Sequence, residues 1–195
     1  MDSNGEVKKI GFRQYLTGHF SLRPSDYLSE EELGLVFDGF VLAFVNCILV
    51  AQDKRLMKML VVKRITEPWA NWWLPGAKMV PGESFEETAV RFLKRQLNLA
   101  TEDRSRFQYL GTYAFVWEKR GIPPTGHGCH ILSTILVLKI DKEEMKAIKI
   151  LGDEYSAFEW VRPEIIVIQA GLHKGLAGCV RDLIEFFGIT KSGRE

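Results

Sequence analysis

The stretch WWLPGAKMVPGESFEETAVRFLKRQLNL, residues 72–99, joins a glycine-containing loop to a helix. Gly76 and Gly82 allow the loop backbone to approach a ligand closely, and the N–H groups at the start of a helix attract anions. Apolar residues at spacings of three, four and seven predict a helix over 84–98 with one face in the core. These apolar residues are Phe85, Ala89, Val90, Leu93 and Leu97. The stretch therefore predicts a loop and a helix that together hold phosphate.

The patterns on either side of this stretch predict a sheet between helices. Two apolar runs flank the polar turn QDKR, which indicates a hairpin. Ser29 and Glu32 have the spacing of a capping box, which starts a short helix over 30–37. The other predicted elements are strands over 41–51, 56–64, 109–119, 129–140 and 157–161, and helices over 141–149 and 172–187. This order is typical of a mixed sheet in the α/β or α+β class.

Composition narrows the class of protein further. The chain has 195 residues, 46% of them hydrophobic, which suits one domain with elaborations. A net charge of +1 gives no overall field for nucleic acid or an anionic membrane. The three cysteines lie far apart without a zinc-binding pattern, so we expect reduced thiols. The apolar stretch 33–51 contains Asp38 and Asn46 and lacks the features of a signal peptide. We therefore expect a cytoplasmic protein with no membrane partner.

Residues 1–27 differ from the rest of the chain. They are polar and aromatic without clear periodicity. This pattern predicts an N-terminal arm, followed by a single domain over 28–195. The arm is expected to drape over the domain or to pair with a partner, including a second copy in a homodimer.

Residues 74–99 resemble the Nudix family, whose box reads G-x5-E-x7-R-E-U-x-E-E-x-G-U, with U an aliphatic residue, after a Leu-Pro-Gly-Gly-like turn. In this sequence LPGA supplies the turn with Ala77 at the second glycine, and Glu83 and Arg91 follow at the family spacing. Leu93 and Leu99 match the aliphatic positions. VVKR before the loop and DEYSAFEWV near the C-terminus also look like Nudix features. The resemblance implies a Nudix α/β/α sandwich with a mixed β-sheet, in which Glu83 and Arg91 form an ion pair.

The sequence departs from the family pattern where Nudix helices carry glutamates. Phe92, Arg95 and Gln96 occupy those three positions, and Asn98 replaces the last glycine. Nudix enzymes use the acids to gather Mg²⁺, which prefers hard oxygen ligands. A cation at Arg95 repels Mg²⁺ and attracts phosphate, so we expect weak or absent magnesium binding. The alternative interpretation of the helix cations is a solvated basic face.

A Nudix branch that lacks some box acids, the GDP-mannose mannosyl hydrolases, is similar in further places. The residues that carry this similarity are Arg64, Pro68, Trp72, Trp73, His130 and His173. It implies that Arg64, Lys78 and Arg91 contact phosphate or nucleotide.

The same similarity assigns three positions around the reaction centre. Gln96 falls where the branch keeps an essential helix glutamate, and Glu154 falls near a further metal ligand. Tyr155 falls where the branch has its catalytic histidine. Trp72 and Trp73 alternate on one strand, so one is expected to pack in the core and the other to stack on a base.

Three functions follow from these expectations. The first is binding of a nucleoside-diphosphate-linked ligand, a nucleotide or a nucleotide sugar, with the catalytic acids lost and little or no hydrolysis. The alternative is an active hydrolase of a GDP-mannose-like nucleotide sugar, with Glu154 and Tyr155 catalytic and Mg²⁺ near Gly76, Gln96 and Glu154. The third is an RNA-binding or scaffold subunit. The expected ligand contacts are Arg64, Trp72, Trp73, Lys78, Arg91, Arg95 and His130, and the loop is shaped by Gly76, Gly82 and Glu83.

Overall fold

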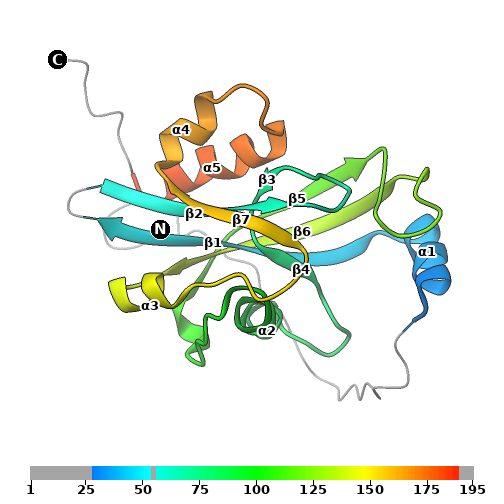
Figure 1. The fold of residues 1–195 in the computed structure, drawn as a ribbon, viewed down its shortest axis with the longest axis horizontal. Helices are drawn as coiled ribbons and strands as arrows, with labels where there is room; N and C mark the ends of the chain where they lie inside the picture. The colour runs from blue at the N-terminus through cyan, green and yellow to red at the C-terminus, as the bar shows by residue number, and fades with distance from the viewer. Residues whose placement is uncertain (1–27, 54–55, 189–195) are drawn as a thin grey trace, which may run out of the picture.

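The sheet organises the computed structural model, which describes residues 28–53 and 56–188 (Figure 1). Its seven strands run in the order β3-β2-β1-β6-β5, with β4 paired to β1 and β7 paired to β2. The strands are β1 (Leu42–Asp53), β2 (Leu56–Arg64), β3 (Trp72–Trp73), β4 (Gly76–Lys78), β5 (Phe107–Trp117), β6 (Cys129–Lys139) and β7 (Tyr155–Val161). β1 and β6 are parallel and the other pairs are antiparallel, so the sheet is mixed as predicted.

Helices cover both faces of this sheet. They are α1 (Glu30–Gly39), α2 (Phe85–Leu97), α3 (Lys142–Ala147), α4 (Pro163–Ile168) and α5 (Lys174–Phe186), with a 3₁₀ turn η2 (Arg104–Arg106) before β5. α2 and α3 lie on one side, α4 and α5 lie on the other, and α1 lies at one end (Figure 1). This α/β/α arrangement confirms the predicted fold class.

Side-chain alternation along β1 divides the core into two layers. Val45, Cys47 and Leu49 pack in the cluster that includes α2. Ile48 and Val50 pack in the cluster that includes α5. Successive strand residues point to opposite faces, so one strand supplies both layers.

α2 begins and ends at residues with clear signals. The Ser84 hydroxyl accepts from the Glu87 amide at 3.1 Å, and the Glu87 carboxylate accepts from the Ser84 amide at 2.7 Å, which forms a capping box. Asn98 ends the helix in the left-handed region at φ 56°. The predicted helix over 84–98 is confirmed, and its start is fixed relative to the preceding loop.

Some boundaries differ from the prediction. β5 runs from Phe107 to Trp117, whereas the prediction was 109–119. The strand starts two residues early because it follows directly after the η2 turn, which Asp103 caps. α4 and β4 have six and three residues, too few for a periodic signal, and were not predicted. The predicted arm over 1–27 lies outside the described residues. Among the described helices, none combines the length and apolar character needed to cross a membrane.

Candidate functional site

The loop between β4 and α2 is held by Glu83. Its carboxylate accepts from Arg91 Nε at 2.6 Å and Nη2 at 2.8 Å, from the Thr88 hydroxyl at 2.8 Å and from the Val80 amide at 3.2 Å. Partial burial raises the pKa of Glu83, but these hydrogen bonds outweigh that effect and lower the pKa overall. The expected ion pair between Glu83 and Arg91 is present, and it ties the loop to the helix.

Two glycines give this loop its shape. A Cβ on Gly76 would lie 2.1 Å from Asn46 Nδ2 and 2.7 Å from the Val45 carbonyl oxygen, so only glycine fits against β1. Asn46 is fixed because it donates to the Leu74 and Pro75 carbonyls and accepts from Ser133. Gly82 has φ 89°, a conformation that favours glycine.

A chain of hydrogen bonds connects the start of β4 to α2 and β7. The Gly76 amide donates to the Tyr155 hydroxyl at 3.2 Å, and that hydroxyl donates to Gln96 Oε1 at 2.9 Å. Gln96 Nε2 then donates to Glu154 Oε2 at 2.7 Å. Burial raises the pKa of Tyr155 far above its usual range, so the phenol is neutral. The structure therefore brings together all the residues predicted around the metal, and Tyr155 with them.

Glu154 completes this chain at the start of β7. Arg64 Nη2 lies 3.5 Å from its Oε1. Burial raises the pKa of Glu154, and the neighbouring Arg64 and Arg95 oppose that shift. Glu154 thus has both an amide donor and a cation beside it.

A cleft of about 590 Å³ opens beside this chain. Arg64 enters from the end of β2, Lys78 from β4, and Arg91 and Arg95 from α2. Burial lowers the pKa of Lys78, with a smaller contribution from Arg91. Among the described residues, the lining includes five cations (Arg64, Lys78, Arg91, Arg95 and Arg120) and three carboxylates (Glu67, Asp153 and Glu154). The excess of cations suits an anionic ligand.

Not every predicted contact residue lines this cleft. Trp73 is 5% exposed and lines it, whereas Trp72 is partly buried against the same apolar cluster and does not line it. His130 is exposed and also does not line the cleft, because its neighbours Cys129 and Ile131 face inward on β6. The alternation of side chains along a strand could not show whether Trp72 or Trp73, or whether His130 or its neighbours, face the cleft.

Arg120 was not predicted, although it lines the cleft. Its side chain is 1% exposed and donates to Asp38 at 2.6 Å, and also to the Ile122 and Gly128 carbonyls. Hydrogen bonds from Arg120 and His127 lower the pKa of Asp38. Arg120 thereby ties α1 to the loop after β5. It was missed because a single arginine in a loop rich in proline and glycine gives no sequence signal for this role.

The side chains on α2 do not fit the magnesium site that the resemblance implies. Phe92 is 1% exposed in the core, Arg95 is a cation, and Gln96 presents its NH₂ group to Glu154. Within the described residues, no group of three or more His, Cys, Asp or Glu side chains is placed to hold a metal ion. Mg²⁺ prefers several oxygen ligands, whereas the α2 side chains that line the cleft (Arg91, Arg95 and Gln96) include no carboxylate, and the neighbouring Glu154 is already paired with Arg64.

An α/β/α sandwich with a cationic cleft between a glycine-containing loop and a helix defines the class of protein. The NUDIX domain family model matches residues 42–183. The chain therefore belongs to the NUDIX domain family. A search of curated protein sequences found no match to the chain.

Solved structures with the same fold include three from different organisms. The NUDIX domain of Shewanella oneidensis NrtR, solved with ADP ribose, has a TM-score of 0.58 and 18% identity, over 82% of this chain and 99% of that one. A Caenorhabditis elegans (C. elegans) Ap4A hydrolase binary complex has a TM-score of 0.55 and 14% identity, over 77% and 100%. The MutT protein from Methanosarcina mazei Go1 has a TM-score of 0.57 and 16% identity, over 75% and 95%. At these identities the similarity shows the fold.

Proposed function

We propose that the protein binds a small molecule linked through a nucleoside diphosphate, a nucleotide or a nucleotide sugar, with little or no hydrolysis. The observation that carries the proposal is the character of α2 at the cleft. Arg95 and Gln96 stand there in place of two box glutamates, and Gln96 is hydrogen-bonded to Glu154. A diphosphate would then meet protein cations directly rather than through metal ions.

The electrostatics of the cleft support direct phosphate contact. Lys78 and Arg95 line the cleft and form no ion pair with the described residues. Arg64 and Arg91 are paired with one carboxylate each. Two cations without a paired carboxylate can each take a phosphate oxygen, at little cost in broken contacts.

The comparisons support the ligand class. The NrtR domain was solved with ADP ribose, and the C. elegans protein is named for hydrolysis of Ap4A. Both compounds join nucleosides through phosphates. A cleft of about 590 Å³ is within the usual range for such ligands.

Binding in the presence of EDTA tests the proposal. Ligand that binds only the folded state raises the unfolding temperature. We expect ADP, GDP, ADP-ribose or GDP-mannose to raise it equally well with EDTA and with Mg²⁺. Arg95→Ala should reduce the shift, while Lys94→Ala, an exposed neighbour that does not line the cleft, should not. No shift with any of these compounds would refute the proposal.

Glu154 supports a second candidate, hydrolysis of a nucleotide sugar. It is a cleft carboxylate whose pKa is raised by burial, a shift that is common among catalytic acids and bases. This candidate predicts product release from nucleotide sugars that stops in Glu154→Gln. The same activity in wild type and Glu154→Gln, or none at high protein concentration, would rule it out. Catalytic roles for Glu154 and Tyr155 remain predictions.

A further inference from the structure

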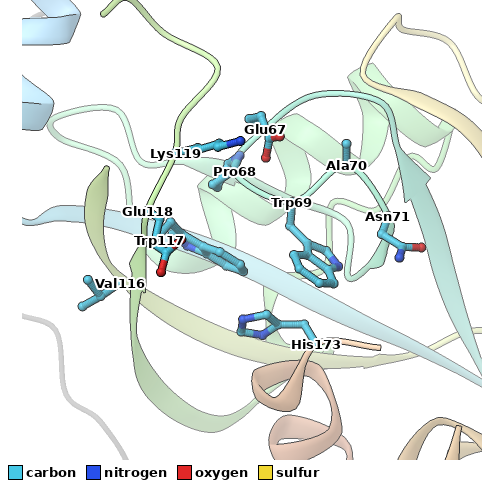
Figure 2. Close-up of a pocket in the computed structure, with 10 residues that line it drawn as sticks. All are labelled: Glu67, Pro68, Trp69, Ala70, Asn71, Val116, Trp117, Glu118, Lys119 and His173. Atoms are coloured by element: carbon cyan, nitrogen blue, oxygen red, sulfur yellow. The ribbon is translucent and has the colours of Figure 1, made fainter. Parts of the chain in front are cut away.

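A second cavity, of about 480 Å³, adjoins the cationic cleft. The two share Glu67, Pro68 and Trp117 as lining residues. Figure 2 shows Trp69, Trp117 and His173 converging on the second cavity from three parts of the chain. Trp69 lies on the loop between β2 and β3, Trp117 ends β5, and His173 caps α5. The two cavities are therefore neighbours that share a boundary at these residues.

The walls of this second cavity are aromatic. The ring centroids of Trp69 and His173 are 4.9 Å apart, and those of Trp117 and His173 are 4.5 Å apart. His173 Nδ1 accepts from the Gly175 amide at 3.0 Å, and burial lowers the pKa of His173, so the ring is held in place and neutral. His173 thus supports both indoles from beneath.

Charge separates the two cavities. Glu67, Glu118 and Lys119 stand around the aromatic cavity, so carboxylates outnumber cations there among the described residues. The neighbouring cleft has the excess of cations. Phosphates are attracted to the cationic cleft and repelled by Glu67 and Glu118. An uncharged aromatic ring is not repelled by these carboxylates.

We infer that the aromatic cavity binds the base of the nucleoside-diphosphate-linked ligand, with Trp69 as the stacking residue. This inference rests on the proposed function and adds the orientation of the ligand: phosphates beside Lys78 and Arg95, base beside Trp69 and Trp117. It also places the stacking residue outside the Trp72–Trp73 pair, one member of which was expected from the sequence to stack; Trp72 lines neither cavity.

The indole edges add a second contact. Trp69 Nε1 and Trp117 Nε1 are both buried, and neither has a hydrogen-bond partner in the part of the chain that the structure describes. An unpaired buried donor is unfavourable, so a ring nitrogen or carbonyl oxygen of the base that reached either N–H would be favoured. Trp69→Phe separates the two contributions, because it keeps a ring for stacking and removes the N–H.

The test compares nucleoside diphosphates with inorganic pyrophosphate by isothermal titration. Stacking on one aromatic side chain strengthens binding on the order of 5- to 150-fold. In wild type, ADP and GDP should bind more tightly than pyrophosphate by a factor in this range. Trp69→Ala should remove that advantage and leave pyrophosphate affinity within about twofold, while Trp69→Phe should retain most of it.

Trp72→Ala is the matched control, since Trp72 is a partly buried tryptophan three residues away and outside both cavities. It should keep the advantage of ADP over pyrophosphate. Circular dichroism and the unfolding temperature check that each variant is folded. An unchanged advantage in folded Trp69→Ala, or the same loss in Trp72→Ala, would overturn the base site. If pyrophosphate binds as tightly as ADP and GDP, the base site is overturned and the proposed function stands. If neither pyrophosphate nor the nucleoside diphosphates bind, the base site and the proposed function are both refuted.

Discussion

Gln96 Nε2 on α2 donates a hydrogen bond of 2.7 Å to Glu154 Oε2 at the start of β7. These residues are 58 positions apart in the chain. Because Gln96 Oε1 accepts from Tyr155 at the same time, the amide has one favoured orientation. A neutral donor thus occupies the place where a carboxylate would face a second carboxylate, and the cleft keeps its excess of cations.

Adding acids to α2 should create a divalent-metal site. Arg95→Glu with Gln96→Glu places two carboxylates on the helix near Glu154, which supplies oxygen ligands of the kind that Mg²⁺ prefers. We expect Mg²⁺ or Mn²⁺ binding by isothermal titration in the double variant. Lys94→Glu, an acid added at an exposed neighbouring position, should bind no more metal than wild type. An unchanged titration in a folded double variant would contradict this.

Glu154 should make stability depend on pH. Burial raises the pKa of Glu154 in the folded state, so its protonated form is favoured there. The contribution of the protonated Glu154 to the free energy of unfolding is fully present below the ordinary glutamate pKa of about 4.3. It is lost as the pH rises through the raised pKa of the folded state. Urea denaturation should show wild type losing stability relative to Glu154→Gln as pH increases over this range. Wild type that gains stability relative to Glu154→Gln as pH rises would disprove the assignment.

The Glu83–Arg91 pair should contribute to stability in the opposite pH direction. The folded-state pKa of Glu83 is lowered, so its contribution is present above the ordinary glutamate pKa and is lost as pH falls through the lowered value. Glu83→Gln should cost about 2 kcal/mol near neutral pH, because it weakens several charged hydrogen bonds. Arg104→Ala breaks the more exposed pair with Glu87 and should cost less than about 1 kcal/mol. Equal losses in chemical denaturation would argue against a structural role for Glu83.

Gly76 should not tolerate a side chain. In Gly76→Ala the Cβ would meet Asn46 and the β1 backbone, and we expect a loss of about 1–3 kcal/mol from overpacking. Gly178→Ala is the control, because a Cβ there meets nothing within 4 Å on α5. It should gain about 0.5–1 kcal/mol from helix propensity. Unfolding curves that rank the two variants in reverse would show that the loop can shift.

Arg120 should be needed to hold α1 against the loop after β5. Arg120→Met removes the buried partner of the partly exposed Asp38 and leaves carbonyl acceptors without a donor, at a cost of about 2 kcal/mol. Lys146→Ala removes an exposed pair with Glu143 at 2.7 Å and should cost less than about 1 kcal/mol. Hydrogen exchange in α1 should also rise in Arg120→Met alone. Unchanged exchange and stability would mean that apolar contacts suffice to hold α1.

Much of the fold could be predicted from local sequence patterns. The apolar spacing of α2, with Asn98 after it, gave its limits to within one residue. The Ser29–Glu32 capping box predicted the start of α1, and the structure has both of its hydrogen bonds. β1, β2 and β6 follow apolar runs because their central residues are buried on both faces, whereas buried and exposed residues mix along β5. Shorter elements such as α4 lacked a periodic signal.

The site was predicted in part. The family resemblance implied the ion pair between Glu83 and Arg91, and it placed Gly76, Gln96 and Glu154 together. His130 and Trp72 were expected at the ligand, but the structure places neither in the cleft. Trp69 and Arg120 were missed because each belongs to an irregular loop, where neighbouring residues do not determine the direction of a side chain.

The sequence alone determined the long strands and helices, the glycines of the loop before α2, and the side chains Phe92, Arg95 and Gln96 that α2 carries. These depend on residues close together in the chain, where turn chemistry and side-chain spacing act directly. Only the tertiary structure decided that Gln96 faces Glu154 and that an aromatic cavity adjoins the cationic cleft. Those relationships join segments far apart in sequence, and packing of the whole sheet against its helices sets their distances.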